Sequence, residues 1–503
     1  MTPQLVALVR KELIRPEDAQ VAGEDGFRFR HLLLRDAAYD ALPKAVRADL
    51  HERYAAWLER HGAALVELDE LVGFHLECAC RYCGELGLPA HDQLAETARR
   101  RLSAAGRRAI VRQDIGAAVS LLERAVALVP PGAVDVVLEV DLVDALLLAG
   151  MGGEALRRAG SLAERASAAG DRVGELCGRI KEGILRYYLM PEVATEKLAA
   201  LIEQALPALQ AEGDDLALYH TYLALAHVAS KSGRYDAVLE AFARAFGHAR
   251  QAGLPYQLSP QRAIARLIGT TPVRELLAWL DEQTARGEPQ SLALPTPRAY
   301  ALAMLGRFDD ARALLAEARS DLADRGAKLP FAITISASAT VELLAGDPAA
   351  TLEFAEEAFS RFDELGERSS LFASAGVVAE ALYALDRLDE AEAWIRRTAE
   401  SDSPDDEMVS REVAAKVLAR RGEHDEAERL AQEAVAVGED TDWLNGQGDA
   451  HANLAEVLLL VGKPDEATAA LKQALTRYQR KGNLVSAQHT QARIDGLRDT
   501  ALR

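Results

Sequence analysis

Four side chains of the types that bind zinc lie close together in the first hundred residues: His75, Cys78, Cys80 and Cys83. Three thiols and one imidazole are a complete ligand set for a structural zinc site. On a helix with about 100° per residue, however, Cys78 lies about 300° and Cys80 about 140° from His75, on nearly opposite faces. The flanking residues indicate a helix and contain no turn residues. The pattern therefore favours unliganded thiols, and we predict no metal and no other cofactor.

A second group of polar residues surrounds a proline near residue 404. Its members are Ser401, Asp402, Ser403, Pro404, Asp405, Asp406 and Glu407. Carboxylates and hydroxyls are ligands for divalent ions, but short polar runs with proline are more typical of a loop between helices. We interpret this segment as a solvated loop.

The sequence contains none of the short motifs of common enzyme classes. There is no G-x-x-x-x-G-K-[ST] loop for phosphate, no G-x-G-x-x-G after a strand, no G-x-S-x-G turn and no H-E-x-x-H pair. The nearest glycine cluster, Gly150-Met151-Gly152-Gly153, follows no predicted strand. We therefore predict no ATP hydrolysis by a P-loop mechanism and no enzymatic activity in this chain.

Composition places the chain among large helical proteins. With 503 residues it exceeds the size of a single hydrophobic core, and it must form several domains or a repeat array. Hydrophobic residues make up 49% and aromatic residues only 5%, so helices packed through small side chains are expected. The formal net charge of −20 disfavours direct binding of nucleic acid.

The cysteine content and the lack of a long apolar run indicate the cellular compartment. Four cysteines in a chain of this length do not form a secreted disulfide framework, and reduced thiols fit the cytoplasm. No run of eighteen apolar residues occurs, and the start lacks the charged and apolar regions of a signal peptide. We expect a cytoplasmic protein that does not contact the membrane.

A six-residue pattern of a turn residue, an acid three positions later and an alanine recurs along the chain. Its clearest copies begin at Gly306, Asp386, Gly422 and Gly462. Weaker copies begin at Gln113, Gly150, Gly233 and Gly346. Two spacings between consecutive copies are about twice the usual length, and degenerate turns at Met190-Pro191 and Gly269–Pro272 divide them. These positions define about ten units of near 39 residues each.

Each unit is predicted to be a helix–turn–helix hairpin. The glycine ends the first helix, and the acid (Asp309, Asp389, Asp425 or Asp465) starts the second, where it accepts from free N–H groups and meets the positive dipole end. The alanine (Ala311, Ala391, Ala427 or Ala467) permits close approach of a neighbouring helix. The apolar stripe that follows must be covered by the next unit, so the hairpins are expected to stack.

These units resemble tetratricopeptide repeats, whose turns share this pattern. The resemblance covers residues 106–482, with a period longer than the family's 34 residues. It implies an all-α, tetratricopeptide-like solenoid of about ten repeats with an inner groove for a protein, peptide or small inducer. Residues 483–503 are predicted to form a polar capping helix, and residues 61–105 a helical connector.

Residues 1–60 follow a different pattern. Leu5, Leu8 and Leu13 indicate a short helix that stops at Pro16, and Phe27–Arg30 alternates apolar and charged residues as a strand does. A long helical run interrupted near Pro43 follows. Helix, turn, strand and helix are the back half of a winged helix, which leaves Leu5, Leu8, Phe27 and Phe29 without their usual cover.

The segment Phe27–Tyr39, with Leu50–Arg53 and Trp57–Glu59, resembles the junction between winged helix and repeat arm in actinobacterial STAND-type regulatory ATPases. Such proteins often carry an adenylate/guanylate cyclase or helix-turn-helix domain. The resemblance implies a partner ATPase domain in cis or in trans, in a polypeptide that extends beyond Met1 or in a separate chain. It also implies a nucleotide-proximal role for His31, although Leu32 stands where the stricter motif has Asp. The alternative for His31 is to cap or orient the following helix.

The sequence thus predicts a non-catalytic sensor module that binds a ligand in its repeat array and couples it to a signalling ATPase or cyclase. The alternative is a transcriptional regulator of the STAND/LuxR-like type that acts directly or through partners.

Overall fold

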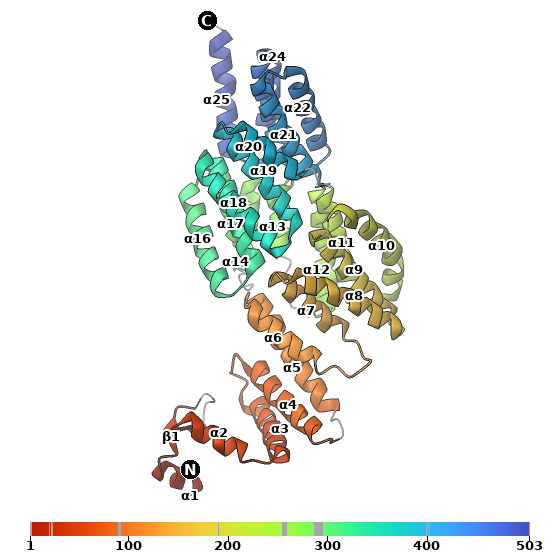
Figure 1. The fold of residues 1–503 in the computed structure, drawn as a ribbon, viewed down its shortest axis with the longest axis vertical. Helices are drawn as coiled ribbons and strands as arrows, with labels where there is room; N and C mark the ends of the chain where they lie inside the picture. The colour runs from red at the N-terminus through yellow and green to blue at the C-terminus, as the bar shows by residue number, and fades with distance from the viewer. Residues whose placement is uncertain are drawn as a thin grey trace. The chain divides into compact units, whose positions relative to one another are not determined.

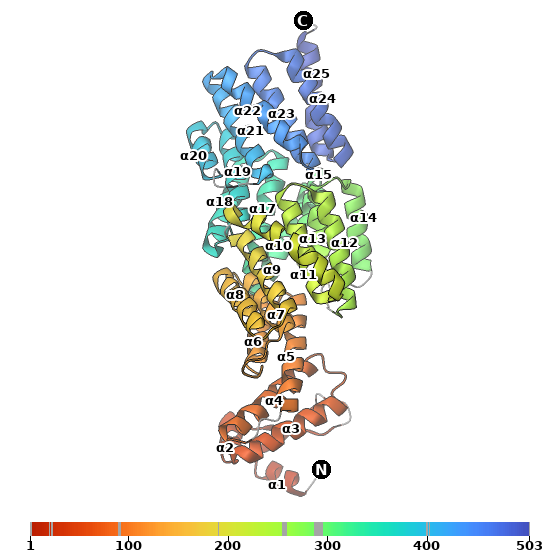
Figure 2. The same cartoon turned by 90° about the vertical axis from the view of Figure 1, so that its right-hand side faces the viewer.

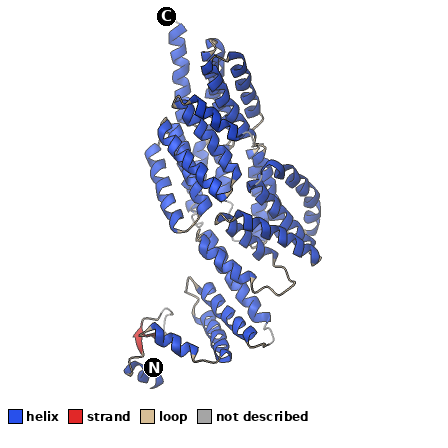
Figure 3. Cartoon of the chain, in the orientation of Figure 1, coloured by secondary structure: helices blue, strands red, loops and turns tan. Residues whose placement is uncertain are grey.

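The computed structural model describes residues 3–19, 21, 24–88, 92–189, 191–253, 259–285, 295–398, 401 and 403–501. These residues form 25 helices and two short strands (Figure 3). The chain divides into two compact units. The first contains Met1–Ile110 and Ala117–Leu142, and the second contains Val111–Gly116 and Val143–Arg503.

The first unit begins with a helix and a two-stranded antiparallel hairpin. Its elements are α1 (Pro3–Arg10), β1 (Ile14–Glu17), β2 (Gly26–Phe29), α2 (Leu32–Asp40), α3 (Lys44–His61), α4 (Leu68–Glu85), α5 (Asp92–Val111) and α6 (Ile115–Val126). The residue pattern predicted one strand and a helix that ends at Pro16. In the structure Pro16 is instead paired with Phe27 in the hairpin. A two-stranded hairpin has only edge strands, where a proline without N–H is tolerated.

The core of the first unit lies between α3, α4 and α5. Ala55 and Leu58 from α3 pack against Val72 and Leu76 from α4 and Ala98 from α5. The elements before α3 contribute little to this core. Phe29 is 40% exposed, and Leu32 and Leu33 at the start of α2 are 67% and 81% exposed.

The second unit is a solenoid of helical hairpins. Its helices are α7 (Val136–Leu148, shared with the first unit), α8 (Gly152–Ala168), α9 (Arg172–Leu189), α10 (Pro191–Glu212), α11 (Asp215–Lys231), α12 (Tyr235–Gln251), α13 (Ser259–Ile268), α14 (Val273–Ala285), α15 (Pro295–Met304), α16 (Phe308–Asp324), α17 (Lys328–Ala345), α18 (Pro348–Leu365), α19 (Arg368–Ala384), α20 (Leu388–Thr398), α21 (Pro404–Arg421), α22 (His424–Glu439), α23 (Leu444–Leu460), α24 (Pro464–Lys481) and α25 (Leu484–Ala501). The all-α, tetratricopeptide-like solenoid expected from the sequence is confirmed (Figure 1).

Each turn that the repeat pattern marked separates an odd-numbered helix from the next even-numbered one, from Gln113 between α5 and α6 to Gly462 between α23 and α24. Met190, which marked one degenerate turn, lies outside the described residues. Gly306, Gly422 and Gly462 have φ near +80° (80°, 85° and 86°), a region that strongly favours glycine. Asp386 takes the same place with φ 63°.

The acid and the alanine of the repeat motif have separate roles. Asp309, Asp425 and Asp465 lie in the first turns of α16, α22 and α24, and none of these three helices has a side-chain hydrogen bond at its N-cap. The expected hydrogen bonds from free N–H groups to these acids are therefore not seen. The acids still lie in the first turn, where a negative charge interacts favourably with the helix dipole. The first turn of α20 holds Asp389, whose carboxylate pairs with Arg421 at 2.5 Å.

The motif alanines Ala311, Ala391, Ala427 and Ala467 are all fully buried. They lie where an even-numbered helix meets its neighbours, and a larger side chain would push those helices apart.

Odd- and even-numbered helices form two layers in this unit. The even-numbered α20 buries one stripe, Ala391, Ile395 and Thr398. The odd-numbered α19 has buried residues around its circumference, from Leu371 to Tyr383. A helix buried on one stripe faces water on the other side, whereas a helix buried all round is covered on both sides. The odd-numbered helices therefore form the inner layer.

The described part of the chain contains one helix, α17, that is long and apolar enough to cross a membrane. Half of this helix is buried within the structure. It packs against α16, α18 and α15, and its apolar composition suits an inner helix of the solenoid.

Successive turns of the superhelix touch at regular intervals along the chain. Arg325 Nη1 donates to Arg112 O (2.5 Å), Leu365 packs at Gly150, Asp442 N donates to Gly233 O (2.8 Å), and Lys481 Nζ donates to Gly269 O (2.7 Å). Each contact joins the turn of one hairpin to the end of the hairpin five further along. Helices α15 and α25, which follow the two segments of the last pair, also contact each other (Figure 2). One superhelical turn of the solenoid thus contains about five hairpins.

Candidate functional site: the cavity inside the repeat array

The second unit contains a partly open cavity of about 660 Å³ between its inner helices. Its wall is drawn from α9, α11, α13, α15, α17, α19, α21, α23 and α25, with Tyr235 at the start of α12. The closing contacts described above bring α9–α13 opposite α19–α25, because they join segments about 210 residues apart. The cavity is therefore a product of superhelical closure. Its volume lies within the range of roughly 300–1,000 Å³ found for small-ligand sites.

Five carboxylates line this cavity. They are Glu380 on α19, Asp405, Asp406 and Glu412 on α21, and Asp449 on α23. Two lysines are close enough to offset part of this charge. Lys231 lines the wall, and Lys416 donates to Glu380 Oε2 at 2.7 Å. The wall therefore carries more acidic than basic groups.

Three of the carboxylates are held by neutral donors through one oxygen. The Tyr235 hydroxyl donates to Asp405 Oδ2 at 2.5 Å, and the Tyr478 hydroxyl donates to Asp449 Oδ1 at 2.6 Å. Asn453 Nδ2 donates to Glu412 Oε2 at 2.8 Å. These contacts fix the orientation of the three carboxyl groups.

The second oxygens of Asp405 and Glu412 are buried and have no hydrogen-bond partner. Glu412 is only 3% exposed. Burial is the main cause that raises the pKa of Asp405 to about 6 and that of Asp449 to about 7, and it raises the pKa of Glu412 well above its ordinary value. Buried polar groups without partners are rare in folded proteins, and clusters of shifted carboxyl groups are characteristic of binding sites.

Apolar side chains cover the rest of the wall. They include Leu267 and Ile268 on α13, Leu343 and Leu344 on α17, and Phe372, Val377, Val409 and Trp443 on later segments. A cavity with a few convergent polar groups on an apolar wall is the usual form of a small-molecule site.

The expectation of a solvated loop at residues 401–407 is wrong for Asp405. Asp402 lies outside the described residues, but Asp405 begins the first turn of α21 and forms part of the cavity wall. The proline that suggested a loop occupies the N1 position of α21, where its missing N–H costs nothing. Local composition could not show this, because Tyr235, the partner of Asp405, is 170 residues away.

Glu412 and Asp449 were not singled out from the sequence. The one available signal was their position on inner helices, since Glu412 precedes the run Val413-Ala414-Ala415. A single carboxylate beside an apolar run is also common on amphipathic helices. Only the spatial meeting of α19, α21 and α23 distinguishes these residues.

His75, Cys78, Cys80 and Cys83 all lie on α4 in the first unit. Burial raises the pKa of Cys78 and raises that of Cys80 to about 11, so both remain thiols at neutral pH. His75 Nδ1 is within 2.7 Å of His51 Nδ1. Within the described ranges, no group of three or more His, Cys, Asp or Glu residues is placed to hold a metal ion.

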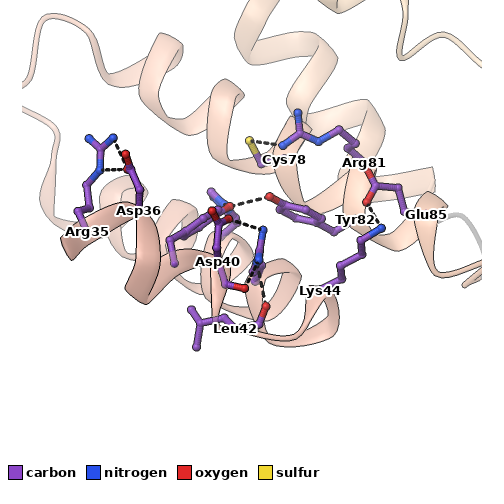
Figure 4. A network of polar contacts seen from close by, with 12 residues as sticks. Arg35, Asp36, Asp40, Leu42, Lys44, Cys78, Arg81, Tyr82 and Glu85 are labelled. Carbon is purple, nitrogen blue, oxygen red and sulfur yellow. Dashed lines mark hydrogen bonds and ion pairs between the residues drawn. The ribbon is translucent and has the colours of Figure 1, made fainter. Parts of the chain in front are cut away.

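The polar contacts around this helix are shown in Figure 4. Arg81 approaches the Cys78 sulfur at 3.9 Å, as Figure 4 shows. The Tyr39 hydroxyl lies 2.9 Å from the Tyr82 hydroxyl and 2.7 Å from His51 Nε2. Burial lowers the pKa of His51 and lowers that of His75 to about 4. These contacts link α2, α3 and α4, so the polar side chains of this region form a structural network.

His31 is the N-cap residue of α2, in extended conformation (φ −132°, ψ 136°), and its side chain makes no capping hydrogen bond. Its imidazole is exposed. Arg35 pairs with the adjacent Asp36 at 2.7 Å, as Figure 4 shows. The nucleotide-proximal role of His31 remains a prediction.

Comparison with known proteins supports the repeat fold. Tetratricopeptide repeat models match residues 408–480, and also residues 296–317 and 376–397. No curated protein matches the chain. The structure of the Cut9–Hcn1 hetero-tetramer of the APC/C is similar with a TM-score of 0.56 at 12% identity, over 92% of this chain and 87% of that chain.

Two further solved structures are similar at lower TM-scores. One is a Signal Transduction ATPase with Numerous Domains (STAND) protein with a tetratricopeptide repeat sensor from Pyrococcus horikoshii. It has a TM-score of 0.35 and 13% identity, over 95% of this chain and 58% of that chain. The other is Rap protein complexed with competence and sporulation factor, with a TM-score of 0.40 and 11% identity, over 73% and 98%. The matched repeats and the hairpin architecture define the second unit as a tetratricopeptide-like array, the class of fold that serves as a protein-interaction scaffold.

Proposed function

We propose that this chain is a non-catalytic sensor module whose repeat array binds a protein, peptide or small inducer in its interior. The observation that carries the proposal is the cavity, whose lining includes Asp405 and Glu412, each with one buried carboxyl oxygen that has no partner. The unpaired oxygens lower the stability of the empty protein, and this stability is regained when a ligand donates hydrogen bonds to them.

The module is further proposed to act in the cytoplasm by coupling ligand binding to a signalling ATPase or cyclase domain. This part rests on the resemblance of Phe27–Tyr39 to the junction of STAND-type ATPases. The surface of the first unit supports a protein partner there. Of the sixteen large hydrophobic residues described as exposed, ten lie between Leu8 and Phe74. Concentrated exposed apolar surface is typical of interaction sites.

The test of ligand binding is a cavity-filling substitution. Ala373 lines the cavity on α19, while Ala393 is exposed on α20 of the same hairpin. The wild type, Ala373→Trp and Ala393→Trp are purified natively and incubated with size-fractionated extract of the source cells, and bound species are identified by native mass spectrometry. We expect a ligand on the wild type and on Ala393→Trp that is lost from Ala373→Trp. Equal retention by all three proteins, or no retained species, would contradict the proposal.

A further inference from the structure

The charges of the cavity wall restrict what can bind there. Five carboxylates face two lysines, and one of those lysines is already paired with Glu380. Burial raises the pKa of Asp405, Glu412 and Asp449 because it destabilises their ionised forms, and an anionic ligand would destabilise those forms further. A neutral polar ligand could donate hydrogen bonds, but only a cation would also compensate the charge of the ionised carboxylates.

The geometry of the carboxylates also disfavours a bare metal ion. Asp405, Glu412 and Asp449 each use one oxygen for a tyrosine or asparagine donor, and no group of three or more possible metal ligands occurs in the part of the chain that the structure describes. The carboxyl groups of Asp405 and Glu412, each with one oxygen fixed and one unpartnered, are instead suited to N–H donors of an organic cation.

The apolar part of the wall adds a second requirement. Leu343, Leu344 and Phe372 line the cavity that Glu412 and Asp449 also line. A ligand that fills this volume must therefore bury carbon as well as charge. A fully hydrated cation would leave the apolar wall uncovered.

We infer that the cavity binds an amphiphilic organic cation, a protonated amine or guanidinium group carried on an apolar body. This inference rests on the proposed function. The cationic group pairs with the unpartnered oxygens of Glu412 and Asp405, and the apolar body packs against α17 and α19. The same chemistry is offered by a free small amine and by the basic end of a short peptide.

Isothermal titration calorimetry of the full chain tests the inference with pairs of probes that have similar shape and opposite charge. Tryptamine is compared with indole-3-propionate, and the amidated tripeptide Trp-Leu-Lys is compared with acetyl-Trp-Leu-Glu. We expect the cationic member of at least one pair to bind at least tenfold more tightly than its anionic counterpart. The pair that shows the larger difference identifies the source, free amine or peptide.

Glu412→Gln and Asp405→Asn keep the shape of each side chain and remove its charge, so each is expected to weaken cation binding at least tenfold. Glu353→Gln, an exposed change on α18, is expected to leave it unchanged. Because the ammonium stabilises ionised carboxylates, cation binding is also expected to release protons, which is measured in buffers of different ionisation enthalpy.

The inference is overturned if the anionic probes bind as tightly as the cationic ones, if both charge-removing variants bind like the wild type, or if no probe binds. These outcomes are distinguishable from failure of the proposed function. If Ala373→Trp still abolishes binding of a cell-derived ligand or of an anionic probe, the cavity is a binding site and only its charge preference is wrong.

Discussion

Two imidazoles meet through their Nδ1 atoms in the first unit, His51 on α3 and His75 on α4, at 2.7 Å. One ring must accept the hydrogen bond, so the two rings cannot both be protonated to imidazolium without losing it. Burial lowers the pKa of both below the ordinary 6.5, for His75 to about 4. The folded state therefore favours neutral histidines.

This pair predicts acid sensitivity of the contact between α3 and α4. As pH falls below about 6.5 the unfolded chain binds protons that the folded chain does not, so stability is full above that pH and falls by about 2 kcal/mol toward pH 4. We expect the amides of α3 and α4 to lose protection between pH 6.5 and 4.5, as measured by hydrogen exchange corrected for intrinsic rates.

His75→Gln is expected to reduce this pH dependence, whereas His61→Gln, an exposed histidine on α3, leaves it unchanged. Loss of protection that is the same in all three proteins would show that other groups cause the acid sensitivity.

At the scale of the element, the repeat turns depend on backbone conformation. Gly422 at the C-cap of α21 has φ 85°, and nothing lies within 4 Å of the position a Cβ would take. Substitution there meets no obstruction in space, so its cost is conformational. Gly247 within α12 also has open space at its Cβ position but has no positive φ.

These two glycines form a matched pair for a stability measurement. Gly422→Ala is expected to lower the free energy of unfolding by about 1 kcal/mol because alanine resists the left-handed conformation, and Gly247→Ala to raise it by about 1 kcal/mol because alanine favours the helix. Urea denaturation measures both. Equal effects of the two substitutions would refute the conformational explanation.

The hairpins were predictable from sequence because their signals are local. The motif of a glycine, an acid and an alanine spans only six residues, so it can be recognised without knowledge of the rest of the chain. Each turn that it marked separates two helices. The strand β1 was missed because Pro16 suggested a helix end. Its pairing with Phe27 is a contact between segments, and residue preferences alone do not report it.

The cavity was not predictable for a similar reason. Asp405 meets Tyr235 across 170 residues, and the angle that each hairpin makes with the next decides whether such residues meet. The sequence shows the period of the repeat but not this angle. The pitch of the superhelix, and with it the identity of the cavity wall, follows from packing that accumulates over five hairpins.

At the scale of the second unit, closure makes distant segments depend on each other. Lys481 is fully buried, and its Nζ donates to Arg266 O (2.9 Å), Gly269 O (2.7 Å) and Thr271 O (2.8 Å). All three N–H donors of the ammonium are therefore used by the turn between α13 and α14.

Lys481→Met is expected to destabilise the second unit by about 3 kcal/mol, because buried carbonyls are left without donors. The loss of protection in hydrogen exchange should reach α13 and α14, about 210 residues away in sequence. Lys472→Met, an exposed change on the same helix α24, provides the control. Exchange that increases only in α24 and α25 would mean that the closing contact does not couple the two segments.

Closure also constrains how relatives of this protein can diverge in length. An open array can gain or lose a hairpin anywhere, since each unit touches only its neighbours. Here the turn after α13 is matched to the end of α24, and the turn after α11 to the segment after α22. Inserting or deleting one hairpin between α13 and α22 would shift both matches at once. Among homologues that keep Lys481, the number of repeats in this span is therefore expected to be invariant.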